Sequence, residues 1–264
     1  MNSVKKIIRD FVGILRVVNS YCALKWACMI LFNFPRIAKE KNLQAADSAM
    51  GQGPFRIRIP KYGVDFQIFG SGAMSGIREM YVRDTYLRGG TINIGANDVV
   101  MDLGANMGNF TNLALAHGNS VRVISVEPSK SLNESFKRSI ALNRGFGDRV
   151  QLIRAFLGSK DKKQENMLQD PEYADADWIE EDELLSVAGI SRIDFLKCDI
   201  EGAEFGLLHP NGKILQMAQK IAIEVHHFAG DVEAFLTMLE GQGFQLRHIQ
   251  RDLDGTVTVL GARQ

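Results

Sequence analysis

The sequence has little cysteine and no excess of charge of either sign. Its three cysteines, Cys22, Cys28 and Cys198, form no CxxC pair and are odd in number, which argues against a disulfide framework and against a structural zinc site. We interpret all three as small buried hydrophobic residues. Lysine plus arginine equals aspartate plus glutamate at 31 each, so the basic stripe typical of nucleic-acid binding is not indicated. We therefore expect a cytoplasmic protein without a nucleic-acid partner.

The sequence also lacks an uninterrupted apolar segment long enough to cross a membrane. A transmembrane helix needs about 20 largely uncharged residues, and Lys25 interrupts the apolar stretch from Val17 to Phe34. No small-residue cleavage site follows this stretch, which argues against a signal peptide. We interpret residues 1–54 as a helical arm (residues 1–40) and a linker (residues 41–54), with the arm packed on the main domain or on a second subunit. Association of this helix with a membrane surface is the less favoured alternative.

The rest of the chain divides into a short lead-in and a larger domain. The length of 264 residues and the 45% hydrophobic content suit one sizeable core with an N-terminal extension. Within residues 55–96, two alternating segments around Gly63 predict a β-hairpin, and a helix is expected to start at Ser75. Over residues 97–264, short β-branched segments alternate with helical stretches, which is typical of βαβ units and a parallel sheet. An Asp-Gly turn at 254–255 predicts a closing hairpin.

The strongest local signal is a glycine turn between a strand and a helix, in the segment VVMDLGANMGNF that contains Asp102. Gly104 and Gly108 would let the backbone approach a bound ligand where a side chain would collide. The helix N-terminus beyond them offers free N–H groups to a carboxylate. Asn106 stands where a dinucleotide-binding turn would have glycine, so the segment departs from GxGxxG. Alone, it is also compatible with a tight turn that binds no ligand.

A second signal is Glu127, which follows the next predicted strand. In adenine-dinucleotide folds an acid at this position binds both ribose hydroxyls, about 20 residues after the glycine turn. Glu127 follows Gly108 at a similar distance, although a glutamate here could instead cap a helix. Together, the Asp102 turn and Glu127 indicate an adenosyl ligand without a pyrophosphate.

A third signal is a group of carboxylates after the fourth predicted strand, in the segment IDFLKCDIEGAE. Asp199, Glu201 and Glu204 lie at the end where open α/β sheets bind ligands. They could hold an acceptor, orient a sulfonium or bind a divalent cation such as Mg²⁺. The alternative is solvated loop charge.

Two histidines follow the fifth predicted strand, in the segment IAIEVHH. Strand alternation places Glu224 and His226 on one side and His227 on the other. A histidine at this strand tip, beside Asp199, is placed to take a proton from an acceptor hydroxyl. We choose His226 over His227 as this general base, with a structural histidine as the alternative. If the strand tips are level, Lys197 and Glu224 form a buried ion pair.

Four segments together resemble the FkbM-type methyltransferase family: DLGANMGNF, VISVEPS, DFLKCDIEGAE and AIEVHH, in that order. The resemblance covers roughly residues 79–243. It implies a Rossmann-like class I methyltransferase fold, with a mostly parallel seven-stranded sheet that ends in an antiparallel hairpin. It also implies S-adenosyl-L-methionine as the methyl donor, and family members mostly methylate hydroxyls of sugars or natural products. The first 54 residues inherit nothing from it.

The resemblance assigns roles to particular residues of this sequence. It implies that the cofactor contacts are Asp102, Gly104, Asn106, Gly108 and Glu127, with Asp199 beside the methionine portion. We assign catalysis to His226, Asp199 and Glu201, and assign no metal ligand, because the resemblance does not require Mg²⁺. The expected acceptor is a small molecule or glycan. The alternatives are an N- or protein methyltransferase, for which no amide-clamp motif is present, and a non-catalytic binding module, which would be expected to lose Glu127 or the glycine turn.

Overall fold

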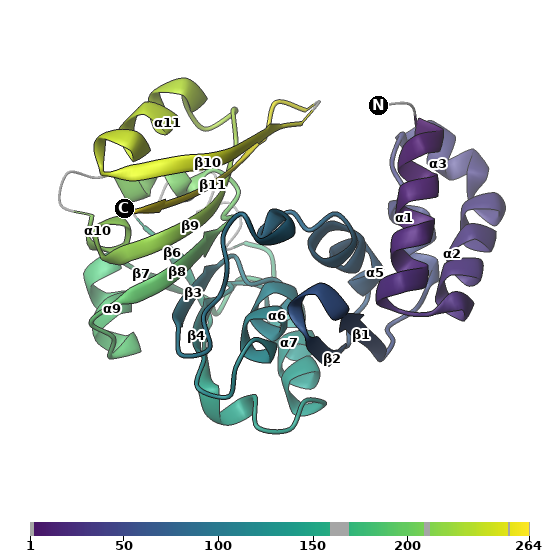
Figure 1. Cartoon of the computed structure of the whole chain (residues 1–264), viewed down its shortest axis with the longest axis horizontal. Coiled ribbons are helices and arrows are strands. Elements are labelled where there is room, and N and C mark those ends of the chain that lie inside the picture. The colour runs from purple at the N-terminus through teal and green to yellow at the C-terminus, as the bar shows by residue number, and fades with distance from the viewer. Residues whose placement is uncertain (1–2, 159–168, 209–211, 253, 264) are drawn as a thin grey trace.

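A seven-stranded sheet lies at the centre of the computed structural model, which describes residues 3–158, 169–208, 212–252 and 254–263 (Figure 1). The parallel strands are β3 (Val99–Leu103), β4 (Arg122–Val126), β5 (Val150–Ile153), β8 (Ile193–Cys198) and β9 (Ala218–Val225). The antiparallel strands are β10 (Phe244–Arg251) and β11 (Val257–Arg263). The strand order is β10-β11-β9-β8-β3-β4-β5, so the predicted Rossmann-like sheet with its closing hairpin is confirmed.

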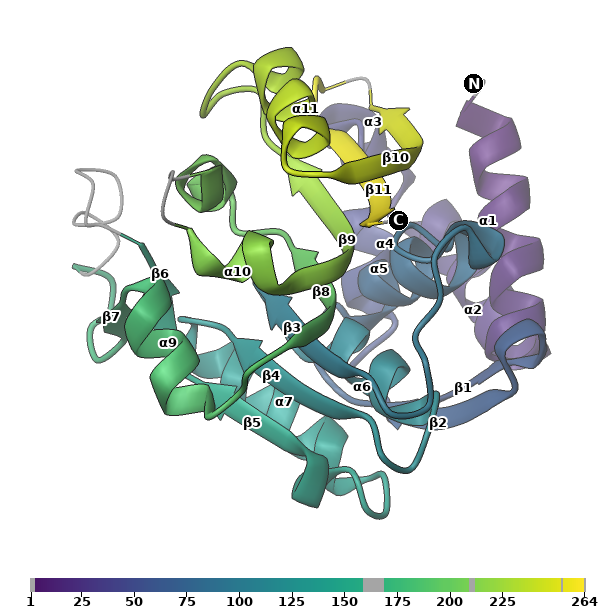
Figure 2. The same cartoon turned by 60° about the vertical axis from the view of Figure 1, so that its left-hand side comes forward.

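Helices cover both faces of the sheet, as the alternation of strands and helices predicts. They are α6 (Asn109–Ala116) and α7 (Lys130–Ala141) on one face, and α9 (Glu181–Ala188), α10 (Lys213–Met217) and α11 (Val232–Gly241) on the other. Figure 2 shows α9 and α10 in front of the sheet and α6 and α7 behind it. Along β3, Val100 packs into the core on the α6 side, whereas Met101 and Leu103 pack on the α9 side. Both faces are therefore buried, which explains the continuous apolar sequence of this strand.

The lead-in segment forms the predicted hairpin and a helical stretch. Strands β1 (Phe55–Ile59) and β2 (Val64–Ile68) pair antiparallel around Gly63, which adopts a positive φ of 67°. Helix α5 (Ala73–Gly76) then continues into a wider helical turn, Ile77–Val82. The predicted helix therefore exists, but it begins two residues before Ser75. After β5 in the chain, β6 (Ala155–Leu157) pairs in parallel with β7 (Asp177–Ile179) to form a small separate sheet.

Four N-terminal helices lie to one side of the sheet, against the lead-in segment (Figure 1). They are α1 (Ser3–Val17), α2 (Ser20–Phe32), α3 (Phe34–Glu40) and α4 (Gln44–Ala49). Residues 3–40 are mostly helical as predicted, whereas α4 lies in the segment that we predicted to be a linker. Within the part of the chain that the structure describes, no helix combines the length and apolarity needed to cross a membrane.

A buried group of ion pairs fixes the N-terminal helices to the domain. Arg78, in the wider helical turn, contacts Asp10 of α1 at 2.7 Å and Asp47 of α4 at 2.6 Å. Asp47 also accepts a hydrogen bond from the indole of Trp26 at 2.8 Å. The structure thus shows the arm packed on its own domain. All three cysteines are free, but Cys28 is exposed, so the prediction that it is buried is wrong.

Candidate active site

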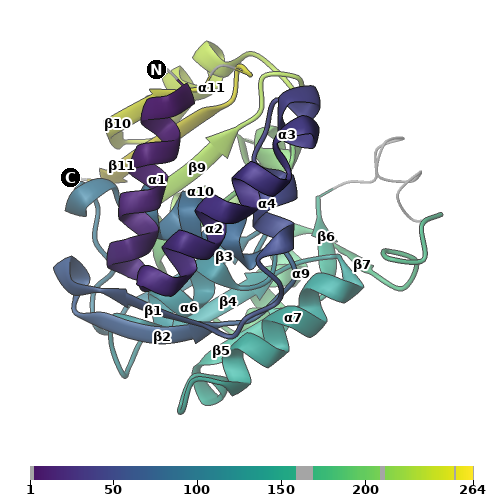
Figure 3. The ribbon, with the colours of Figure 1, turned by 90° about the vertical axis from the view of Figure 1, so that its right-hand side faces the viewer.

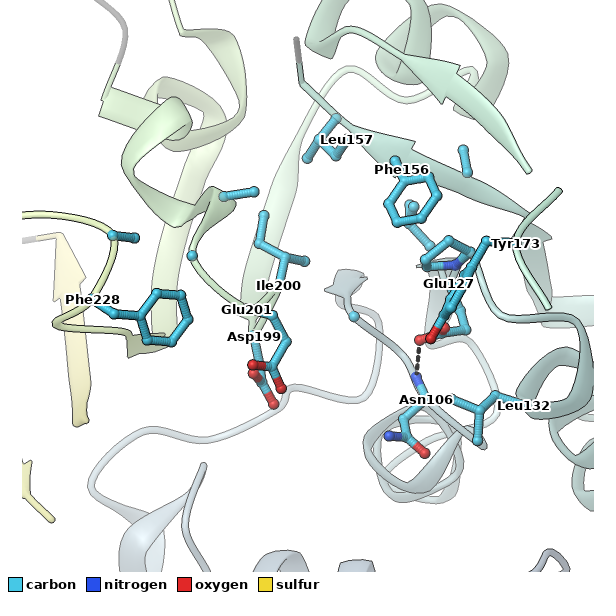
Figure 4. A pocket seen from close by; sticks show the side chains of 17 residues that line it. Asn106, Glu127, Leu132, Phe156, Leu157, Tyr173, Asp199, Ile200, Glu201 and Phe228 are labelled. Atoms are coloured by element: carbon cyan, nitrogen blue, oxygen red, sulfur yellow. Dashed lines mark hydrogen bonds between the residues drawn. The ribbon is translucent and has the colours of Figure 1, made fainter. Parts of the chain in front are cut away.

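A cavity of about 520 Å³ lies where the parallel strands end. Its walls come from the segments after β3, β4, β8 and β9 and from β6; they include Gly104, Asn106, Glu127, Phe156, Asp199, Glu201 and Phe228. Figure 4 shows Asp199 and Glu201 on one side of the cavity and Glu127 and Asn106 on the other. Three of the predicted motifs therefore contribute to one cavity, at the edge of the sheet where α/β folds bind ligands. Among the described residues, neither Glu224 nor His226 of the segment IAIEVHH lines it.

The glycines of the turn after β3 are required by packing within the protein. A Cβ atom at Gly104 would lie 1.7 Å from the carbonyl oxygen of Asp199, and one at Gly108 would lie 2.7 Å from the Phe136 ring. Both glycines have positive φ, and so does Asn106 at 53°, a conformation that asparagine tolerates better than most residues. The described residues that line the cavity include Gly104 and Asn106 but not Gly108. Gly108 packs closely against Phe136 of α7, and its predicted contact with the cofactor stays a prediction.

Glu127 is held rigidly at the cavity wall by two backbone amides. Its Oε2 accepts a hydrogen bond from the N–H of Asn106 at 2.8 Å, and its Oε1 accepts one from the N–H of Ser129 at 2.9 Å. Burial raises the pKa of Glu127, whereas these two amide hydrogen bonds lower it. Each carboxylate oxygen has a second lone pair, so Glu127 can still accept hydrogen bonds from a diol in the cavity.

Asp102 and Lys197 lie beneath the glycine turn and do not face the cavity. The fully buried Asp102 accepts a hydrogen bond from the Thr111 hydroxyl at 2.7 Å. Lys197 lies 3.4 Å from the other Asp102 oxygen and donates a hydrogen bond to the carbonyl of Gly104 at 2.7 Å. Burial opposes the charged amine, but Asp102 and Asp199 outweigh it and raise the pKa of Lys197. The Asp102 carboxylate and Lys197 thus support the turn, and the predicted contact of Asp102 with the cofactor stays a prediction.

The predicted Lys197–Glu224 ion pair is wrong because the strand tips are not level. Strand β8 pairs Lys197 with Ala222 of β9, two residues before Glu224. The same register continued along the strands brings Glu224 beside Asp199. The buried Tyr86 hydroxyl joins these two carboxylates, at 3.2 Å from Asp199 Oδ2 and 3.1 Å from Glu224 Oε2. We did not predict Tyr86, which comes from the lead-in segment.

Asp199, Glu224 and His226 converge beside the cavity. One potential ligand atom of each lies within 4.8 Å of the others, which is close enough for a divalent cation. We had considered Asp199, Glu201 and Glu204 for such a site. In the structure, Glu224 and His226 lie beside Asp199 in place of Glu201 and Glu204. The Glu201 side chain is 80% exposed, and Glu204 is turned toward His226.

His226 is oriented by a buried carboxylate. Its Nδ1 lies 2.7 Å from Glu204 Oε1, and its side chain is only 8% exposed. The other ring nitrogen, Nε2, lies on the Glu201 side, 3.8 Å from Glu201 Oε2. His227 is exposed and its ring packs against Gly255, away from this group. The predicted alternation of the two histidines is therefore confirmed.

The carboxylates around His226 change its ionisation. Burial opposes the charged ring, but the hydrogen bond to Glu204 and the charges of Glu204, Asp199 and Glu201 outweigh burial and raise the pKa of His226 to about 9. Burial, followed by the charges of Asp199 and Glu79, raises the pKa of Glu224. The negative charge of these carboxylates therefore favours the protonated forms of His226 and Glu224, and it equally favours a ligand that brings positive charge.

Residues 93–246, more than half of the chain, match the family model of the methyltransferase FkbM domain. No curated protein matches the sequence. Among solved structures, the chain is similar to the fibrillarin pre-rRNA processing protein of Methanococcus jannaschii, at 14% identity and a TM-score of 0.44 over 65% of this chain and 69% of that one. It is similar to fibrillarin of Aeropyrum pernix with natively bound S-adenosyl-L-methionine, at 10% identity and 0.41 over 65% and 69%. Another similar structure is precorrin-6y C5,15-methyltransferase of Geobacter metallireducens, at 12% identity and 0.44 over 69% and 87%.

Proposed function

Because the chain belongs to the FkbM methyltransferase family and uses S-adenosylmethionine, we propose that it methylates a hydroxyl group of a sugar, glycan or natural product. The observation that carries this proposal is the buried Glu204–His226 pair beside the cavity. An alcohol is a weak nucleophile at neutral pH, so a base that removes its proton accelerates the reaction. A thioether leaving group, in contrast, needs no acid.

The residues around the cavity fit S-adenosylmethionine. Glu127 is positioned to accept hydrogen bonds from ribose hydroxyls, because its carboxylate is fixed by Asn106 and Ser129 and keeps free lone pairs. On the opposite wall, Asp199 and Glu201 provide negative charge for the cationic methionine portion. The bound cofactor supplies an electrophilic methyl group, which an acceptor oxygen must approach in line with the sulfur.

His226 is the proposed general base, and Glu204 is its positioning residue. With Nδ1 occupied by Glu204, Nε2 is the nitrogen left to accept the acceptor proton. A pKa of about 9 keeps His226 mostly protonated at neutral pH. A positively charged ligand beside Asp199 and Glu201 would offset the negative charge of these carboxylates, which stabilises the protonated His226 ring. Ligand binding on that wall therefore lowers the pKa of His226 and prepares it to act as a base.

The acceptor class is tested with methyl-labelled S-adenosylmethionine and a matched panel of sugars, glycans, alcohols and amines. Mass spectrometry of the products then locates the label on oxygen or nitrogen. Label on a hydroxyl oxygen supports the proposal. Transfer to amines or to protein alone would favour an N- or protein methyltransferase, and cofactor binding without transfer to any acceptor would favour a non-catalytic module.

A further inference from the structure

Helix α2 is apolar on the face that it buries and on the face that it exposes. Its buried side, with Cys22, Trp26 and Ile30, packs against the domain. Its opposite side carries exposed Tyr21, Leu24, Cys28 and Leu31, followed by Phe32 and by Phe34 of α3. Leu31 is 74% exposed and Phe32 is 80% exposed. A helix that is apolar all around is normally covered on all sides, so the outer face requires an explanation.

The N-terminal segment that carries this apolar face is rich in basic residues. Residues 1–41 contain eight lysines and arginines but only two acidic residues, Asp10 and Glu40, although the whole chain is neutral. Asp10 is buried and pairs with Arg9 as well as with Arg78, and Glu40 pairs with Arg36. The segment still keeps six more basic than acidic residues. The exposed basic residues of this segment are Lys5, Lys6, Arg9, Arg16, Arg36, Lys39 and Lys41. Figure 3 views the molecule from this side, with α1 and α2 in the foreground.

We propose that the outer face of α1–α3 binds an anionic lipid surface. Exposed leucine and aromatic side chains with flanking lysines and arginines are typical of helices that lie in the membrane interface. The apolar side chains would enter the acyl boundary, and the basic side chains would contact the anionic headgroups. The arm packs on its own domain, as expected from the sequence, and the structure adds which apolar side chains of α2 stay exposed after one face is buried.

A second copy of the chain fits this face less well than lipid does. A two-fold symmetric dimer places the same patch on both subunits, so the basic residues of one copy would face those of the other. Like charges opposed across an interface disfavour association. Anionic headgroups instead complement the basic residues and the apolar side chains together.

The exposed face belongs to the folded protein and is not a transient feature of a loose arm. Arg78 joins Asp10 of α1 to Asp47 of α4, and the Trp26 indole of α2 donates to Asp47. These buried contacts fix the rotation of α2, so Leu31 and Phe32 cannot turn inward without breaking them.

The test is sedimentation of the full-length protein with vesicles of equal parts phosphatidylglycerol and phosphatidylcholine, and with vesicles of phosphatidylcholine alone. We expect binding to the anionic vesicles, at least tenfold stronger than to the neutral ones and weakened by salt. The variant L31S/F32S should lose binding at least tenfold. The matched variant V187S/M238S, which removes exposed apolar side chains elsewhere, should bind as the parent does. Circular dichroism and cofactor affinity confirm that each variant is folded.

Three results would overturn the proposal. The first is equal vesicle binding by L31S/F32S and the parent, and the second is no vesicle binding by the parent. The third is a dimer in lipid-free solution that L31S/F32S converts to a monomer, which would assign the face to a second copy. A charge variant, K5E/K6E, separates the two contributions, because it should weaken binding to anionic vesicles while it leaves the apolar face intact.

Discussion

Replacing Glu204 with glutamine isolates the interaction that we assign to the catalytic histidine. Glutamine keeps the size of the side chain and an oxygen that can accept the Nδ1 proton, but it removes the negative charge. In the parent protein the pKa of His226 is about 9, against an ordinary value of 6.5. That difference corresponds to about 3 kcal/mol in favour of the charged ring. Burial acts in the opposite direction, so in E204Q the pKa should fall toward 6.5.

NMR titration of the His226 imidazole in the ligand-free protein measures this change without an acceptor. Glu201→Gln is the matched control, because Glu201 lies 3.8 Å from Nε2 but its side chain is 80% exposed, and water screens its charge. E201Q should therefore lower the pKa of His226 much less than E204Q does. The reasoning is refuted if E204Q still titrates near pH 9, or if E201Q lowers the pKa equally.

The same substitution predicts a change in stability with pH. A histidine whose pKa is raised by folding stabilises the protein fully below the unfolded value of about 6.5 and loses that contribution as the pH rises through about 9. The raised pKa of Glu224 acts in the same direction. The free energy of unfolding of the parent should therefore fall over this interval, and the fall should be smaller in E204Q.

Three further substitutions or treatments test other parts of the site. Glu127→Ala should weaken S-adenosylmethionine binding at least tenfold in titration calorimetry, because a hydrogen bond to a charged group contributes about 1.5–3 kcal/mol; unchanged affinity would remove Glu127 from the cofactor site. Lys197→Met should lower the free energy of unfolding by about 3–5 kcal/mol in urea titration, since it leaves Asp102 buried without its cation. A cost below 1 kcal/mol would contradict the buried pair. Chelation with EDTA should leave turnover unchanged if His226 is a base; lost turnover that Mn²⁺ restores would instead make Asp199, Glu224 and His226 metal ligands.

Much of the fold could be predicted from the sequence because each strand and turn has a local signature. Alternation in IAIEVHH correctly separated His226 from His227, and the apolar strand before Asp102 correctly placed the turn. Alternation gives the side of the sheet on which a residue lies, but it does not give the register between parallel strands. The Lys197–Glu224 prediction failed on this point, because β9 is offset by two residues.

Contacts between distant segments could not be predicted. Tyr86 reaches Asp199 and Glu224 from more than 100 positions earlier in the chain, and its sequence neighbourhood has no motif. The glycine turn shows a related limit. A glycine in a turn indicates that another group lies close to its Cα, but the sequence does not identify that group. At Gly104 it is the backbone of Asp199.

The most direct test of the account is the rate of methyl transfer by His226→Ala, measured beside His227→Ala with a hydroxyl acceptor from the panel. We expect H226A to lower turnover by about 10²–10⁴, the usual contribution of a general base, while S-adenosylmethionine affinity stays close to that of the parent. H227A should retain turnover, because the His227 ring packs against Gly255, away from the Glu204–His226 pair. Full turnover by H226A, or an equal loss in H227A, would contradict the assignment of His226 as the base.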